Sequence, residues 1–155
     1  MLRREVRDNA FKLVFEQLLR DDDINELYEI AEEVDEINLN DDVKKIVGGT
    51  IEHCQEIDEI ISRYSKSRSI SRISKINLAI LRIALYEAVY DENVPVNVAI
   101  SEAVNIAETY TYQEDISFIN GVLGAFARNN QKEDNKNAWI YRDWYKQLYH
   151  FGSCL

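Results

Sequence analysis

Residues 74–90, SKINLAILRIALYEAVY, decide what kind of fold this chain can form. Apolar side chains in this stretch lie on nearly every side of the helix that it would make. A helix that is apolar all round is buried, because no face of it gains from contact with water. The stretch therefore predicts a central helix, ended by DENVP at residues 91–95.

Arg82 lies within the apolar part of this stretch. A buried guanidinium needs an acidic partner, because burial without one costs several kcal/mol. Glu102, in the next helical segment, is the candidate. We expect a structural ion pair between Arg82 and Glu102 rather than a ligand contact.

The segments on either side also have apolar residues at helical spacing. Five glycines and one proline are too few for the turns of an all-β protein. We expect an all-α fold of about six to seven helices, with Pro95 in a first turn, Asp115 as a cap and a close helix crossing at Gly48 and Gly49. The expected helices cover residues 3–19, 24–34, 42–64, 74–90, 95–110 and 116–128, and a last aromatic helix follows within residues 136–151.

The negative charge of the chain is concentrated in one segment. The formal net charge is -10, but residues 21–42 hold eleven acids and no Lys or Arg. The rest of the chain therefore sums to +1, and residues 62–75, SRYSKSRSISRISK, hold five basic side chains and no acid. Such local basic segments leave nucleic-acid binding open despite the overall acidity.

Enzymatic and metal sites are not expected. His53 and Cys54 are adjacent, so on a helix they point about 100° apart and cannot bind one metal together. No glycine-rich phosphate loop or nucleophile elbow occurs. No apolar run approaches the ~20 residues of a membrane span, and Cys54 and Cys154 form no CxxC pair. We expect a reduced, cytoplasmic protein without a cofactor.

Three blocks of sequence carry a family resemblance. They are AILRIALYE at residues 79–87, VPVNVAISEAVNIAETY at 94–110 and FINGVLGAFAR at 118–128. In their order and spacing the chain resembles the NusB family of transcription antitermination factors. The resemblance covers residues 3–128, and we expect one domain over residues 1–128. Residues 129–155 would form a polar linker and an aromatic helix of unassigned role.

This resemblance implies a fold and a function. The fold would consist of two small helical subdomains. The protein would not be an enzyme; it would bind the boxA segment of nascent RNA together with NusE, a small-subunit ribosomal protein. That complex would help RNA polymerase in the elongation complex to read through terminators in rRNA operons.

The resemblance places RNA-binding arginines at the N-terminus. Arg3, Arg4 and Arg7 match the arginine-rich motif of the family. Their i, i+3 and i+4 relations place them on one side of a helix, where a guanidinium can bind phosphate through two hydrogen bonds or stack on an unpaired base. We expect this side to face an RNA groove; an ordinary basic N-terminus is the alternative.

A second group of RNA contacts is implied further along the chain. Phe118, Asn120 and Gly121 match the Phe-Val-Asn-Gly stretch of the family, and we expect them beside the arginines. Phe118 could stack on a base or pack in the core. Asn120 could satisfy buried backbone groups, and Gly121 could permit close helix packing.

Contacts with NusE are implied at Tyr86, Glu87 and Glu114, because acidic contacts suit a basic ribosomal protein. Two alternatives stay open. The chain could be a helical protein–protein adaptor without an RNA role, or a homodimer whose interface masks the RNA surface.

Overall fold

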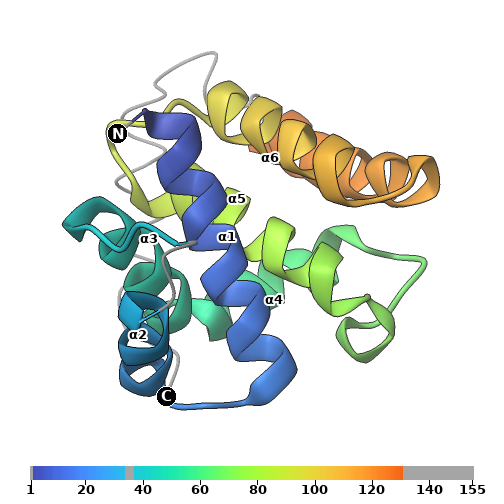
Figure 1. Ribbon diagram of the computed structural model, residues 1–155. Helices are drawn as coiled ribbons and strands as arrows, with labels where there is room; N and C mark the ends of the chain where they lie inside the picture. The colour runs from blue at the N-terminus through green and yellow to red at the C-terminus, as the bar shows by residue number, and fades with distance from the viewer. Residues whose placement is uncertain (1, 34–36, 131–155) are drawn as a thin grey trace.

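Helices account for nearly all of the secondary structure in the computed structural model, which describes residues 2–33 and 37–130 (Figure 1). No β-strand occurs in those two ranges, and the all-α prediction is confirmed. The elements are α1 (Arg3–Arg20), α2 (Ile24–Glu33), α3 (Asp41–Glu52), α4 (Cys54–Tyr64), the short 3₁₀ helix η1 (Ile70–Arg72), α5 (Lys75–Tyr90), α6 (Val96–Tyr110) and a further helix over residues 113–130.

The helix α5 is the centre of the fold, as its sequence predicts. Twelve of its sixteen residues are buried, and they lie on all sides of the helix. It contacts α1, α3, α4 and α6, and α1 also contacts α2 and α3. Figure 1 shows α1 crossing in front of α5.

The prediction of one continuous helix over residues 42–64 is wrong, because the segment forms two helices that meet at His53. The backbone of His53 leaves helical geometry, with φ -103° and ψ 14°, and α3 and α4 meet there. The His53 ring stacks on Tyr90 of α5, with 3.8 Å between ring centroids and 10° between planes. The break therefore lets both halves of the segment pack on α5.

The expected close crossing at the two glycines is confirmed for Gly49 and wrong for Gly48. A Cβ atom built on Gly49 would overlap the ring of Tyr86, whereas one built on Gly48 would meet nothing within 4 Å. Only Gly49 lets α3 approach α5 so closely.

Two polar contacts differ from expectation. Arg82 pairs with Asp58 of α4, at 2.9 Å from Nε to Oδ1 and 2.7 Å from Nη2 to Oδ2, so the predicted partner Glu102 is wrong. The last described helix begins at residue 113, so Asp115 lies in its first turn instead of capping it from outside. There the Asp115 carboxylate accepts a hydrogen bond from the backbone N–H of Tyr112 at 3.3 Å, as in a capping box.

The expected aromatic helix at 136–151 and Cys154 lie outside the described residues. Within the described residues, no helix combines the length and the apolar character that crossing a bilayer requires.

Candidate nucleic-acid interface

The first two turns of α1 place three arginines against three acids of α5, α6 and the segment between them. Arg7 is the buried member. Its Nε donates to both oxygens of Glu87 at 2.9 and 3.0 Å, and the two residues are 5% and 1% exposed. Burial raises the pKa of the Glu87 carboxyl, and the hydrogen bonds from Arg7 oppose that shift. Arg7 therefore fastens α1 to the central helix.

Arg4 makes the corresponding pair on the surface. Its Nε and Nη2 donate to the two oxygens of Glu102, both at 3.3 Å. The Arg4 side chain is 72% exposed. The hydrogen bonds from Arg4 lower the pKa of the Glu102 carboxyl, so the pair is charged at neutral pH.

Arg3 is the least constrained of the three. Its side chain is 56% exposed, and its Nη2 lies 3.9 Å from the buried carboxylate of Asp91. Arg3 and Arg4 thus present guanidinium groups to solvent at the start of α1, whereas Arg7 does not. Of the three arginines expected to face one groove, Arg7 is buried, and of the two exposed ones only Arg4 lines the adjacent cleft.

A cleft of about 660 Å³ lies beside Arg4, between α1 and α6. Asp8 and Tyr110 join its walls, since the Tyr110 hydroxyl donates to Asp8 Oδ1 at 2.7 Å. Burial, reinforced by Asp8, raises the pKa of Tyr110 to about 12. Carboxylates outnumber cations in this cleft. Its lining is Arg4, Glu5, Asp8, Asn9, Asn38, Glu102, Asn105, Ile106, Glu108, Thr109 and Tyr110.

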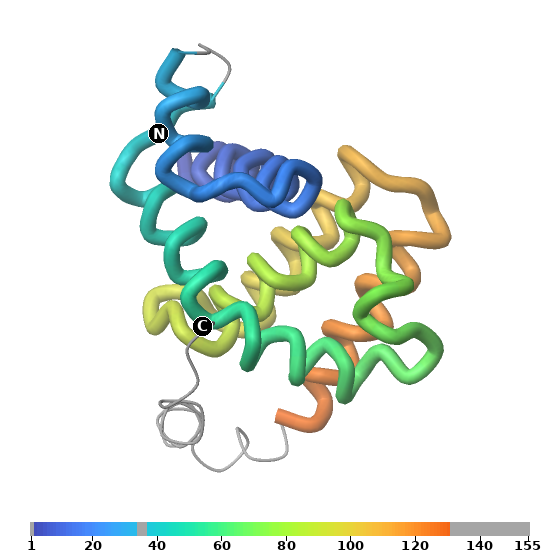
Figure 2. Tube along the Cα trace, turned by 90° about the horizontal axis from the view of Figure 1, so that it is seen from below, coloured from blue at the N-terminus to red at the C-terminus, as the bar shows by residue number. Residues whose placement is uncertain are grey.

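Phe118 does not lie beside the N-terminal arginines. It is half-buried against the core, and the Arg68 guanidinium carbon lies 4.4 Å from its ring centroid. Arg68 belongs to the loop between α4 and α5, which lies at the opposite side of the molecule from the N-terminus in Figures 1 and 2. The structure therefore separates the two predicted groups of RNA contacts.

Asn120 and Gly121 are both exposed. Their expected structural roles are wrong: Asn120 is not in a buried environment, and a Cβ atom on Gly121 would meet nothing within 4 Å. Both positions are available to a ligand instead.

The predicted NusE contacts also divide by burial. Tyr86 and Glu87 are 6% and 1% exposed, and the Tyr86 ring lies against Gly49. Burial, with Asp91 as the next cause, raises the pKa of Tyr86 to about 12. Glu114 is exposed in the first turn of the 113–130 helix, so it is the one of the three that a partner can reach.

Comparison with known proteins identifies the family. The NusB family model matches residues 4–128. This chain belongs to the NusB family. The transcription antitermination protein NusB of Thermoanaerobacter sp. (strain X514) is 38% identical over 138 residues, which cover 88% of this chain and 98% of that protein. NusB of Bacillus subtilis (strain 168) is 36% identical over 123 residues, covering 79% and 92%.

Solved NusB structures have the same fold. T. maritima NusB superposes with a TM-score of 0.72 at 32% identity, covering 83% of this chain and 92% of that one. A crystal structure of the antitermination factors NusB and NusE in complex with dsRNA gives a TM-score of 0.71 at 28% identity, covering 82% and 96%.

For this NusB-family chain, sequence reasoning missed two features of the surface. The sequence did not predict that Arg7 is buried in an ion pair with Glu87, or that Arg68 contacts the ring of Phe118. The absence of acids in residues 62–75 indicated that Arg68 would have no acidic partner within its own segment. No cluster of His, Cys, Asp and Glu suited to a metal occurs among the residues that the structure describes.

Proposed function

We propose that this chain is a cytoplasmic transcription antitermination factor that binds boxA-type single-stranded RNA together with NusE. In this role it helps the RNA polymerase elongation complex to read through terminators in rRNA operons, by binding and not by catalysis. The observation that carries the proposal is the likeness to the solved NusB–NusE–dsRNA complex, which extends over 82% of this chain. The relatives named as antitermination proteins support the same role.

Arg3 and Arg4 are the RNA contacts of this proposal at the N-terminus. Both are exposed, and an exposed ion pair such as Arg4–Glu102 contributes little to stability. A phosphate can therefore replace the carboxylate and accept two hydrogen bonds from the same guanidinium. Arg7 contributes indirectly, by holding the first turns of α1 against Glu87.

Phe118, Asn120 and Gly121 enter the proposal as a separate contact region on the 113–130 helix. Glu114, exposed at the start of the same helix, is the proposed contact with NusE. A basic ribosomal protein suits an acidic contact, which also speeds encounter.

The cleft between α1 and α6 favours the adaptor function as a second candidate. Glu5, Asp8, Glu102 and Glu108 line it, with Arg4 as the only Lys or Arg among the described residues of the lining. Such a cleft is suited to a lysine or arginine side chain of a protein partner and not to RNA phosphate. In that case NusE binding would occur without any effect of RNA.

Fluorescence anisotropy with a labelled boxA RNA, with and without NusE, tests the proposal. The double variant Arg3→Gln/Arg4→Gln should lower the salt slope of binding by about 1.4, because each phosphate contact with a single strand contributes ~0.7. Lys44→Gln/Lys45→Gln is the matched control, since it removes two exposed cations from α3. Equal RNA binding by the two variants would contradict the site, and NusE binding that RNA does not change would favour the adaptor.

A further inference from the structure

The loop between α4 and α5 carries cations that form no ion pair with any acid of residues 2–33 and 37–130. Lys66, Arg72 and Lys75 are exposed and Arg68 is half-buried. None of these four takes part in an ion pair within the described residues, whereas Arg3, Arg4 and Arg7 each face a carboxylate. We call residues 65–75, with these four cations, the basic loop. In a chain of net charge -10, it is the strongest candidate for a surface of positive potential.

Phe118 holds one of these cations without neutralising it. The Arg68 guanidinium carbon lies 4.4 Å from the centroid of the Phe118 ring. A cation–π contact restrains the guanidinium but uses none of its N–H donors, unlike a carboxylate partner. Arg68 therefore keeps its full charge and its hydrogen-bonding capacity, and less conformational entropy is lost when it binds an anion.

The basic loop has a defined backbone shape. The Arg68 N–H donates to the Ser65 carbonyl at 3.1 Å, and the Arg72 N–H donates to the Ser69 carbonyl at 2.9 Å. These turns set the directions in which the neighbouring cations leave the backbone. The hydroxyls of Ser69 and Ser71, 3.2 Å apart on the surface, add neutral hydrogen-bonding groups between the cations.

Two helices start next to the basic loop and add to its potential. Ser74 caps α5 by accepting from the Asn77 N–H at 3.3 Å, and the Asn77 side chain donates to Asp115 Oδ1 at 2.8 Å. This bond ties the start of α5 to the first turn of the 113–130 helix, so two positive helix ends lie close together. Asp115 and the exposed Glu114 are the acids of that first turn, and they limit the positive surface on this side.

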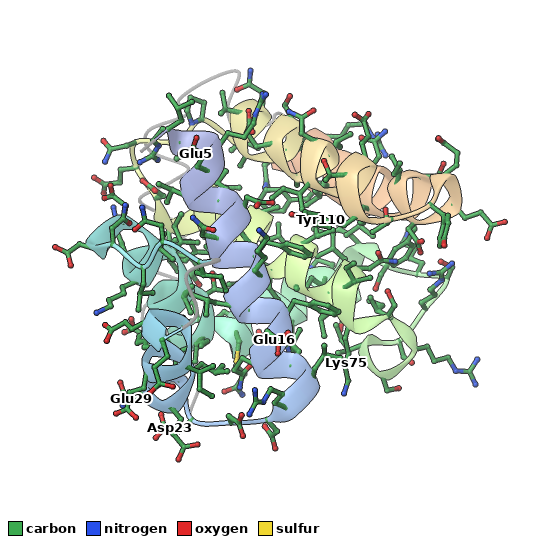
Figure 3. All side chains as sticks on the ribbon, viewed as in Figure 1. Glu5, Glu16, Asp23, Glu29, Lys75 and Tyr110 are labelled. Atoms are coloured by element: carbon green, nitrogen blue, oxygen red, sulfur yellow. The ribbon has the colours of Figure 1, made fainter. Side chains whose placement is uncertain are left out.

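We propose that the basic loop and Phe118 form a second binding surface for the sugar-phosphate backbone of single-stranded RNA, apart from Arg3 and Arg4. This inference rests on the proposed RNA-binding function and extends it. The combination of spaced cations, hydroxyls and an aromatic ring is typical of surfaces that follow a single strand. Figure 3 places Lys75 and Glu5 of α1 at different ends of the molecule, so a single strand must extend across the protein to reach both surfaces.

The test measures anisotropy with two labelled RNAs, boxA alone and boxA with flanking sequence on both sides. The variant Lys66→Gln/Arg72→Gln should lower the salt slope for the longer RNA by about 1.4 and weaken its binding about tenfold at low salt. The same variant should affect boxA alone less, because the longer RNA brings more phosphates within reach of the basic loop. Lys44→Gln/Lys45→Gln removes the same charge from α3 and should change neither result.

A second variant separates the role of Phe118 from the total charge. Phe118→Leu keeps an apolar side chain and every cation, but it removes the ring that orients Arg68. It should weaken binding of the longer RNA by a few-fold, because Arg68 is no longer held in place. The salt slope should stay unchanged, because no charge is removed. Circular dichroism melting checks that Lys66→Gln/Arg72→Gln and Phe118→Leu are both folded.

The outcomes are distinguishable. If Lys66→Gln/Arg72→Gln binds the longer RNA with the wild-type salt slope, the second surface is wrong, while the N-terminal site is judged by the Arg3 and Arg4 variants. If that variant loses NusE binding and keeps RNA binding, the loop is a protein contact and the inference is overturned. If the wild type binds neither RNA, with or without NusE, both the proposed function and this inference fail.

Discussion

Arg7–Glu87 and Arg4–Glu102 join the same kinds of groups within one turn of α1, yet they differ in burial. The first pair is 6% and 1% exposed in its side chains, and the second is 72% and 17% exposed. In the first, burial raises the carboxyl pKa; in the second, the arginine lowers it. The difference shows that neighbouring arginines of one sequence motif can have different roles. Arg7 fastens α1 to α5, whereas Arg3 and Arg4 are exposed to solvent.

A third pair lies between these extremes. Arg82 and Asp58 are 14% and 25% exposed, with two hydrogen bonds of 2.9 and 2.7 Å. If burial decides what an ion pair does for this fold, the cost of removing the arginine should follow the order Arg7, Arg82, Arg4.

Removing Arg7 should have the largest effect. Arg7→Ala leaves the Glu87 carboxylate buried without a partner, which costs about 3–5 kcal/mol of unfolding free energy. Urea denaturation measures this loss. The double variant Arg7→Met/Glu87→Leu removes both charges and should recover most of it. A loss below about 1 kcal/mol in Arg7→Ala would break the comparison, because the pair would then behave as a surface pair.

Removing Arg82 should have an intermediate effect. Arg82→Ala takes two charge-assisted hydrogen bonds from Asp58, which water can partly replace because both side chains reach solvent. We expect a loss of about 1.5–3 kcal/mol in the same denaturation experiment. Asp58→Asn should cost less than Arg82→Ala, since the amide oxygen still accepts one bond. A cost as large as that of Arg7→Ala would show that burial does not set the order.

Removing Arg4 should have the smallest effect on stability, and that effect should depend on pH. Glu102 has a lowered pKa in the folded protein, so its pair with Arg4 stabilises the fold above the ordinary carboxyl pKa. This contribution is lost as the pH falls through the lowered pKa. Melting temperatures of Arg4→Ala and wild type should therefore converge in acid and differ slightly at neutral pH. A difference that grows in acid has the wrong sign for this pair.

Much of the fold follows from local pattern. Residues 74–90 predict a buried helix because their apolar character needs no knowledge of what surrounds them, and α5 covers Lys75–Tyr90. The start of α3 is also set locally, because the Asn40 side chain accepts a hydrogen bond from the Val43 N–H at 2.9 Å. Such features depend on residues a few positions apart.

The site is less predictable because its contacts join distant segments. Glu102 and Asp58 are both plausible acids for Arg82, and only the packing of α4 on α5 selects Asp58. Phe118 meets Arg68 across fifty residues, for the same reason. Charge pattern indicates that residues 62–75 are basic, but it does not reveal which ring they meet.

The contact between Gly49 and Tyr86 has a consequence for how this chain can change in evolution. The ring occupies the space that any side chain at position 49 would need, so a substitution there is tolerated only where the residue at position 86 is smaller. The two positions are 37 residues apart, yet they should covary among homologues. Position 49 therefore cannot change first, because a smaller residue at position 86 must precede any side chain at position 49.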